Sequence, residues 1–419
     1  MTAPSLRSRI LLAAAGAAVA LALAEGALRL RTPPDLLFAE QDARVGYALT
    51  PNFERHIPMP ERAEGAVLRT NNLGLRRDTP TTIERSPGVA RVLVLGDSQT
   101  EGIVNNHESF SAVLERGLGS SDRPVEVLNA GVAGYSPLLE YLWLRERGLA
   151  LRPDVIVLAL YAGNDLLELG VGEVTFGGYG PRLRIPQIAA DPPHRIAYPG
   201  DAAGWLGGLD WWLESHVRLY ALARRVIVRT APGANAPLGT LAARCPGCLQ
   251  SMAQGFVARG DPEALADDVR RLDYLLGEIA RLAREIGAEL LVVLIPSKLE
   301  VEPESVRAQV ESGLATLGLA YDPAAFDAEA RRRMIGAATS HGLRVIDLQP
   351  GLRATYGATG QPLYWAFDWH LNPEGHRAVA GALLSDVEGA LARSAGGPPA
   401  MRASGPRSHG GRAARAPAN

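Results

Sequence analysis

Five short, largely apolar runs alternate with helical patterns after Val89, the third of them continuously apolar, and this alternation constrains the fold more than any other feature. The runs are RVLVLG (91–96), VEVLNAG (125–131), DVIVLALYAG (154–163), ELLVVLIP (289–296) and LRVIDL (343–348). Strands that are apolar on both faces and separated by helices are typical of a parallel sheet covered on both sides. The predicted fold class is therefore α/β, with a doubly wound (flavodoxin-like) parallel sheet.

Helical patterns fill the spaces between these runs, at 108–118, 136–149, 262–286, 326–342 and 373–391. Ser136 followed by Pro137 predicts an N-cap and a first helical residue. The alternation stops between residues 166 and 261, which is too long for a structureless loop and predicts an insertion with its own small structure. Its helical pattern DWWLESHVRLYALARR contains Trp211 and Trp212. We expect both to pack on the core rather than to line a cleft or touch a membrane.

The N-terminus indicates export. Two arginines precede an apolar run over residues 10–24 (ILLAAAGAAVALALA). Positive charge ahead of an apolar run is the mark of an export signal. Either a signal peptidase cleaves near Ala24, or the run continues past Glu25 as an uncleaved anchor over residues 10–30, because a membrane span needs about 20 residues. We favour the anchor, and in both cases expect an extracytoplasmic protein, in the periplasm or at the cell surface.

Composition shifts divide the remaining chain. The predicted organisation is a signal peptide or anchor (1–31), an irregular lead-in with room for a β-hairpin (32–88), the α/β domain (89–393, insertion 166–261), and a disordered tail (394–419). The tail is basic and of low complexity, which is typical of disorder.

Several function classes are excluded. The formal net charge of −2 argues against a general nucleic-acid binder, which needs basic surface to neutralise phosphates. The sequence contains no phosphate-binding loop, no dinucleotide fingerprint and no metal-ligand cluster, so we expect neither cofactor nor metal.

The two cysteines lie close together, as Cys245-Pro-Gly-Cys248. In a cytosolic protein this spacing favours a redox dithiol, and zinc would need further ligands nearby. In an exported chain, and with no strand directly before the pair, a small local disulfide is the preferred interpretation.

Polar clusters follow the strands where each one ends. They are Gly96-Asp97-Ser98 after the first run, NAGVAGYS (129–136) after the second, Gly163-Asn164-Asp165 after the third, and DWHLNP (368–373) before the last helix. Each alone is a common turn. Because the carboxyl ends of parallel strands meet at one edge of a sheet, the order and position of the set predict a catalytic site there.

The arrangement resembles the SGNH (GDSL-type) hydrolase superfamily, in particular its membrane-anchored extracytoplasmic branch. That branch also has segments similar to VGYALTPN, TNNLGLR and VVLIPSK. The resemblance covers the α/β domain without its insertion and implies an SGNH-hydrolase architecture. It implies that Ser98 is the nucleophile, that Ser98, Gly134 and Asn164 form the oxyanion hole, and that Asp368 and His370 are the acid and base.

The chemistry of these residue types fits those roles. A serine hydroxyl is a poor nucleophile until a base such as His370 accepts its proton. Asp368 would hold the imidazole in the right tautomer. The amides of Ser98 and Gly134 and the side chain of Asn164 supply donors for the developing oxyanion.

The last block departs from the commonest form of the superfamily. It spaces acid and base as Asp-x-His rather than Asp-x-x-His, a spacing similar to that of alginate-type acetyltransferases.

His376 is the other candidate base, and we interpret it as a solvated helix residue. Asp97 and Asp165 are expected to cap turns or brace the site, whereas Glu101 and His107 have no assigned role.

The sequence therefore predicts an extracytoplasmic serine esterase that hydrolyses short-chain acyl esters. The resemblance and the expected compartment imply small-molecule or carbohydrate esters as substrates, with acetyl as the expected acyl group and cell-envelope material as the expected carrier. Two alternatives remain open. The same triad can transfer the acyl group to a sugar hydroxyl, or the chain can be a non-catalytic, membrane-tethered binding protein.

Overall fold

The computed structural model of the chain describes residues 5–31, 38–119, 124–170, 172–175, 182–199, 262–316, 329–366 and 369–396, with short pieces between 209 and 223. Cys245 and Cys248 lie outside the described residues, as do Asp368 and residues 397–419.

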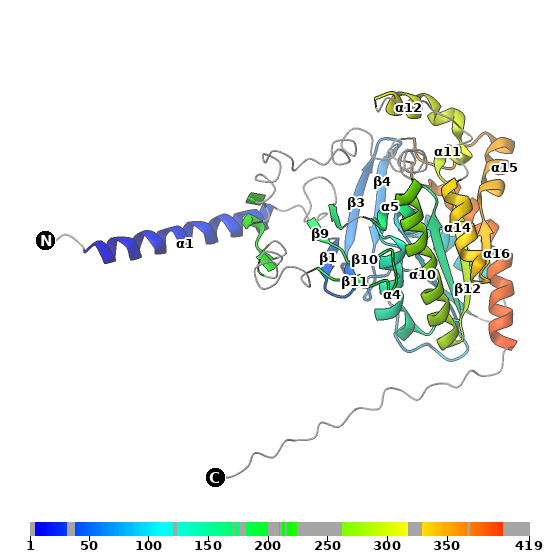
Figure 1. Cartoon of the computed structure of the whole chain (residues 1–419), viewed down its shortest axis with the longest axis horizontal. Coiled ribbons are helices and arrows are strands. Elements are labelled where there is room, and N and C mark those ends of the chain that lie inside the picture. The colour runs from blue at the N-terminus through cyan, green and yellow to red at the C-terminus, as the bar shows by residue number, and fades with distance from the viewer. Residues whose placement is uncertain are drawn as a thin grey trace, which may run out of the picture.

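Five parallel strands form the central sheet (Figure 1). Their spatial order is β13-β12-β7-β5-β6. The strands are β5 (Ala90–Gly96), β6 (Val125–Asn129), β7 (Val155–Tyr161), β12 (Glu289–Ile295) and β13 (Arg344–Asp347). Numbered along the chain, this is the flavodoxin-like order 2-1-3-4-5, which confirms the predicted doubly wound sheet. The order reverses between β5 and β7, where such sheets bind ligands at the carboxyl ends of their strands.

Helices cover both faces of the sheet because alternate side chains of each strand point to opposite sides. Leu93 and Leu95 on β5 belong to the core beneath one layer of helices. Val92 and Val94 belong to the core beneath the other. The first layer holds α4 (Pro137–Glu146), α10 (Pro262–Ile286) and α14 (Glu329–Ser340), and the second holds α3 (Phe110–Leu118) and α16 (Pro373–Gly396). Both sides of the inner strands β5 and β7 are therefore buried, which explains their unbroken apolar runs, whereas the edge strand β13 stays partly exposed.

Further helices complete the domain. They are α2 (Ser98–Glu101), α5 (Asp165–Glu168), α11 (Lys298–Val301), α12 (Pro303–Thr316), α15 (Gln349–Thr359), and the 3-10 turns η2 (Asn106–Glu108) and η3 (Gly148–Leu151). Ser136 is the N-cap of α4 and Pro137 its first residue, as predicted.

The lead-in folds as two β-hairpins, where the sequence predicted an irregular segment with at most one. The pairs are β1 (Ala39–Asp42) with β2 (Gly46–Leu49), and β3 (Glu54–Met59) with β4 (Arg62–Arg69). Tyr47 and Leu49 of β2 are part of the core that also contains Leu95 of the central sheet.

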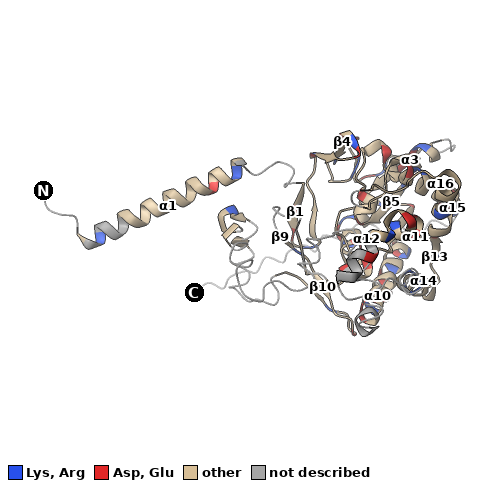
Figure 2. Cartoon of the chain, turned by 90° about the horizontal axis from the view of Figure 1, so that it is seen from above, with Lys and Arg blue, Asp and Glu red and all other residues tan. Residues whose placement is uncertain are grey.

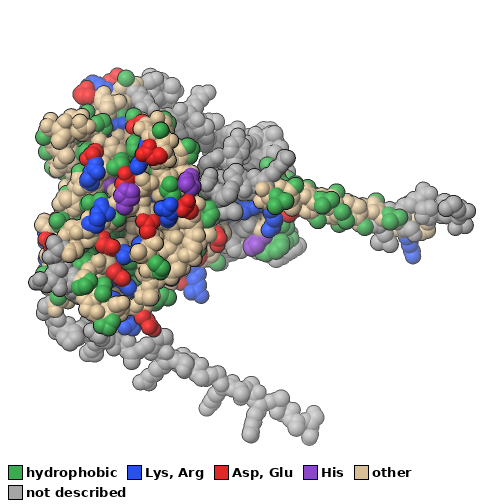
Figure 3. All heavy atoms as spheres, turned by 180° about the vertical axis from the view of Figure 1, so that it is seen from behind, with side chains coloured by type: hydrophobic (Ala, Val, Ile, Leu, Met, Phe, Trp, Pro, Cys, Tyr) green, Lys and Arg blue, Asp and Glu red, His purple; other side chains and the backbone are tan. Residues whose placement is uncertain are grey.

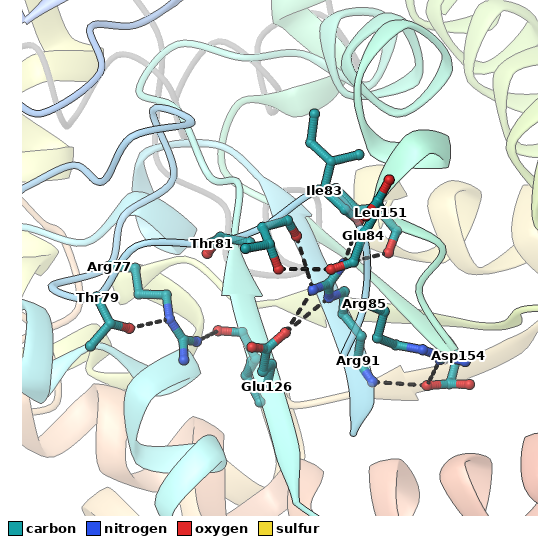
Figure 4. A network of polar contacts seen from close by, with 12 residues as sticks. Arg77, Thr79, Thr81, Ile83, Glu84, Arg85, Arg91, Glu126, Leu151 and Asp154 are labelled. Carbon is teal, nitrogen blue, oxygen red and sulfur yellow. Dashed lines mark hydrogen bonds and ion pairs between the residues drawn. The ribbon is translucent and has the colours of Figure 1, made fainter. Parts of the chain in front are cut away.

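A buried arginine ties the lead-in to the amino-terminal end of the sheet (Figure 4). Arg91 on β5 is fully buried and bonds Glu126 on β6 at 2.9 Å. Its guanidinium also donates to the carbonyls of Thr82, Ile83 and Leu151. A buried guanidinium is tolerated only when such partners replace its hydration. The network lies at the opposite end of β5 from Ser98.

The N-terminal helix α1 (Leu6–Arg31) extends away from the domain (Figures 1 and 2). Residues Leu12–Leu30 form one helix that is long and apolar enough to cross a membrane, and none of it is buried. Its apolar side chains lie open along its length (Figure 3). A signal sequence has the same features, so cleavage near Ala24 and anchoring by residues 10–30 both stay predictions.

The described parts of the insertion are short. Two small hairpins pair β8 (Glu173–Thr175) with β9 (Arg182–Arg184), and β10 (Gln187–Ile188) with β11 (Ile196–Ala197). The Trp212 side chain is not packed in the core as expected. It is 49% exposed and stacks on His216. Its segment lies against the end of α1 instead of the core, and Arg29 of α1 donates to the His216 carbonyl. Trp211 lies outside the described residues.

Candidate active site

Ser98 begins α2 at the point where β5 ends. Asp97 is the N-cap of this turn, as expected. Its buried carboxylate accepts the Gln99 amide at 2.9 Å and a long bond from the Ser98 hydroxyl at 3.4 Å. The sharp change of direction requires glycine at position 96, where a Cβ would lie 2.1 Å from Oγ1 of Thr100. The serine is thus carried on a tight strand-to-helix turn at the carboxyl edge of the sheet.

The loop that carries His370 is hydrogen-bonded to the residue after Ser98. The side chain of Gln99 donates to the carbonyl of Trp369 at 3.3 Å and accepts the amide of Leu371 at 3.0 Å. The carbonyl of His370 accepts the amide of Trp365 at 2.8 Å. The structure therefore brings His370 to the serine turn although the two are far apart in the sequence.

The segment leading into this loop is held by residues that follow β12, in α11 and at its two ends. Buried Lys298 donates to the Trp365 carbonyl at 2.9 Å, and the Tyr364 hydroxyl donates to the Pro296 carbonyl at 2.5 Å. Glu302 accepts the amides of Leu363 and Tyr364. Asp368, the expected acid, lies outside the described residues.

The loop that carries Gly134 is held from two sides. Buried Glu101 accepts the Ala133 amide at 2.6 Å, and the Tyr47 hydroxyl donates to the Ala133 carbonyl at 2.7 Å. Gly134 has a φ of +75°, and a Cβ there would lie 2.9 Å from the Tyr47 hydroxyl and 3.3 Å from Cγ1 of Val174. Both its backbone conformation and its surroundings therefore require glycine.

Asn164 lies beside Asp97, at the end of the neighbouring strand β7. It is buried, and its side chain donates to Glu168 at 2.8 Å and is also hydrogen-bonded to Asp97. The next residue, Asp165, accepts the Tyr161 amide at 2.7 Å, so it braces the turn as expected. Asn164 thus meets the serine turn at the point where the strand order of the sheet reverses.

Asp97 is the residue on which these contacts converge. Burial raises the pKa of Asp97 to about 6, and the Gln99 amide, the charge of His370 and the side chains of Ser98 and Asn164 oppose that rise. Burial likewise raises the pKa of Glu101, opposed by its neighbours, of which Arg76 is the strongest. A perturbed carboxyl group at the carboxyl edge of a sheet is typical of a functional site.

Three further carboxyl groups are buried behind the serine turn. Burial raises the pKa of Glu140, Asp165 and Glu168, and repulsion from Asp97 adds to it in each case. Glu140 is 0% exposed, and neither of its carboxyl oxygens has a hydrogen-bond partner among the described residues. A buried carboxyl without a cationic partner is held in its neutral form.

His376 is a buried residue, and the interpretation of it as solvated is wrong. Its ring stacks on Phe110, and Nδ1 accepts the Phe110 amide at 3.2 Å. Burial lowers the pKa of His376 to about 3. It faces α3 because it lies on the same side of α16 as Val379 and Leu383, and it serves in packing rather than as a base.

Sequence reasoning also missed the polar residues that support the site. Arg76, from the lead-in, is buried and donates to the carbonyls of Glu101, Gly102 and Val104. Tyr47, Gln99 and Glu101 were likewise unassigned. His107 is exposed. Among the described residues, no group of three or more His, Cys, Asp or Glu side chains is arranged to hold a metal ion.

Comparison with known proteins places the chain in a family. The model of the GDSL-like lipase/acylhydrolase family matches residues 94–378, which is more than half of the chain. No curated protein matches the sequence.

Similar solved structures include LAE5, an α/β hydrolase from the metagenome of Lake Arreo, Spain. It has 13% identity over 74% of this chain and 99% of that one, with a TM-score of 0.36. An acetyl xylan esterase, AlAXEase, has 14% identity over 71% and 99% and a TM-score of 0.36. The lipase/acylhydrolase from Enterococcus faecalis has 13% identity over 72% and 96% and a TM-score of 0.34. The family model alone carries the assignment: this chain belongs to the GDSL-like lipase/acylhydrolase family and is an ester-hydrolysing enzyme of the SGNH type.

Proposed function

We propose that the enzyme hydrolyses esters through an acyl-enzyme formed on Ser98, with His370 as the base and Asp368 as the acid that orients it. One observation carries the proposal: the side chain of Gln99, the residue after Ser98, bonds the backbone on both sides of His370. Covalent catalysis requires the nucleophile and its base to lie within reach of each other, and the Gln99 side chain joins the segments that carry them.

The reaction has two steps. The Ser98 Oγ attacks the ester carbonyl carbon while its proton passes to His370, and a tetrahedral intermediate forms. The intermediate expels the alcohol, which takes the proton from His370, and leaves the acyl group bonded to Oγ. Water then attacks the same carbon by the same route, releasing the carboxylic acid and the free serine. Asp368 keeps the imidazole in the productive tautomer and stabilises its charged form.

The negative oxygen of each intermediate is assigned to three donors. They are the amides of Ser98 and Gly134 and the side chain of Asn164. The contacts that hold the Gly134 loop support this assignment for its amide, because a donor fixed in advance needs no reorganisation during the reaction. The Asn164 side chain donates to Glu168 and Asp97 in this structure, so it has to exchange one of these bonds to donate to the oxyanion. Loss of one such donor costs on the order of a hundredfold in rate.

The substrate is assigned as a short-chain acyl ester, with acetyl as the expected group, on carbohydrate or cell-envelope material. The side chains of Tyr47 and Val174 fill the space beside Gly134, which supports a small acyl group. The exposed apolar helix α1 supports an extracytoplasmic protein anchored in a membrane by residues 10–30. Glu25 forms an ion pair with Arg29 at 2.7 Å. This pairing supports membrane anchoring, because an unpaired charge within the helix would disfavour its insertion into the membrane.

The test is ester hydrolysis by the full chain in detergent, with p-nitrophenyl acetate, butyrate and octanoate. Ser98→Ala and His370→Ala are expected to lose at least about a thousandfold in kcat. The matched control is His341→Ala, a histidine at the end of α14, which should keep the wild-type rate. Wild-type rates in Ser98→Ala would refute the assignment. With a sugar acceptor present, acetylated sugar in place of acetate would identify a transferase.

A further inference from the structure

Gln99 joins the serine turn to the histidine loop. It is 2% exposed, and its side chain uses one donor and one acceptor on the two peptide groups that flank His370: the Trp369 carbonyl at 3.3 Å and the Leu371 amide at 3.0 Å. A side-chain amide offers a donor and an acceptor at this reach in one group that does not titrate. Because Gln99 directly follows Ser98, any movement of its side chain changes where His370 lies relative to the serine.

The loop needs such a restraint. Trp369 has a φ of +66°, a left-handed conformation that a bulky residue adopts only when its surroundings impose it. Its buried indole and the bond from Gln99 to its carbonyl are the surroundings that the structure provides. Without that bond the peptide between Trp369 and His370 is free to rotate towards an ordinary conformation, and the imidazole would turn with it.

Other contacts hold the preceding segment independently of Gln99. Lys298 bonds the Trp365 carbonyl and Glu302 bonds the Tyr364 amide. The Trp365 amide in turn bonds the His370 carbonyl. Loss of the Gln99 amide should therefore leave the loop folded and change only the local position of the imidazole.

We propose that Gln99 is a positioning residue that sets the distance and orientation of His370 relative to Ser98. The inference rests on the proposed roles of those two residues. Misplacement of a reacting group by about 1 Å costs up to a hundredfold in rate. Removal of the Gln99 amide is therefore expected to lower kcat by about 10- to 100-fold and to leave KM within about twofold.

The experiment compares Gln99→Leu, which keeps the size of the side chain, with Gln99→Glu in the full chain. Two readouts are used: kcat and KM for p-nitrophenyl acetate, and the rate at which a fluorophosphonate labels Ser98. Both kcat and the labelling rate should fall by the same factor in Gln99→Leu. The matched control is Asn72→Leu, because the Asn72 amide likewise bonds the carbonyl and the amide of one residue, Thr81, in the lead-in. It should keep wild-type kcat.

Gln99→Glu supplies a readout that a merely structural role would not move. An ionised glutamate accepts the Leu371 amide but cannot donate to the Trp369 carbonyl, whereas a protonated one can do both. The ratio of kcat in Gln99→Glu to kcat in Gln99→Leu should therefore rise as the pH is lowered. A constant ratio, wild-type kcat in Gln99→Leu, or an equal loss in Asn72→Leu would overturn the inference. Absence of Ser98 labelling in the wild-type chain would instead refute the proposed function itself.

Discussion

Replacing Glu140 by glutamine should stabilise the folded enzyme above pH 4.5. Glu140 is fully buried on α4, and neither carboxyl oxygen has a partner among the described residues. Burial raises its pKa well above the usual 4.5, and the charges of Asp97 and Glu168 add to that rise. Burial also raises the pKa of the neighbouring Asp165 carboxyl, and repulsion from Glu140 adds to that rise. The folded state therefore keeps a proton that the unfolded chain releases.

The sign and size of the effect follow from proton linkage. Below pH 4.5 both states hold the proton, and Glu140 contributes no pH dependence. Above it the unfolded chain ionises while the folded chain does not, so the free energy of unfolding falls by about 1.4 kcal/mol per pH unit until the pH reaches the raised pKa. Glutamine has the same shape and no proton to lose. Glu140→Gln should therefore match the wild type near pH 4.5 and exceed it by about 3 kcal/mol two units higher.

The assay is urea unfolding of the wild type and Glu140→Gln, followed by tryptophan fluorescence in steps from pH 4.5 to 8. The midpoint gives stability, and an unchanged m-value shows that the same surface is exposed on unfolding. The pH 4.5 measurement is the internal control, since the two proteins should coincide there. Parallel curves across the whole range would show that Glu140 ionises alike in both states and would refute the reasoning.

Two further predictions concern the supports of the site. Gly134→Ala should lower kcat by about a hundredfold, because its Cβ would press on the Tyr47 hydroxyl; rates of p-nitrophenyl acetate hydrolysis measure this, and a wild-type rate would exclude Gly134 from the oxyanion hole. Arg76→Met should lower the free energy of unfolding by about 3 kcal/mol, because three buried backbone carbonyls lose their donor. Urea unfolding tests it, and a loss below about 1 kcal/mol would mean that water replaces the guanidinium.

Local pattern was enough to predict most of the fold. The sequence predicts a helix over Pro262–Ile286, and α10 occupies the same residues. Its apolar spacing and its first residue, a proline, are both local signals. By contrast α15 was not predicted, since Pro350 and two glycines weaken its helical pattern. The helix α16 continues to Gly396, five residues past the expected end, because LARSA contains no residue that stops a helix.

The residues that support the site were much less predictable. Serine, asparagine and histidine at strand ends carry recognisable chemistry, whereas Gln99, Glu101 and Arg76 gain meaning only from partners distant in sequence. Arg76 and Glu101 are 25 residues apart, and Gln99 and Trp369 are 270 apart. No local pattern pairs them. The burial of His376 had a signal that was available, since Val379 three residues on marks the same helix face.

The bond between Gln99 and the Trp369 carbonyl also has a consequence for the order in which the molecule is assembled. Closing a loop of 270 residues costs about 5 kcal/mol of chain entropy, so the contact is unfavourable until the intervening strands have paired. Collapse of the sheet must come first, and His370 reaches the serine turn only afterwards. Recovery of hydrolysis on refolding should therefore lag behind recovery of helix and sheet. A chain still being synthesised, with His370 not yet made, has no complete site with which to attack an ester.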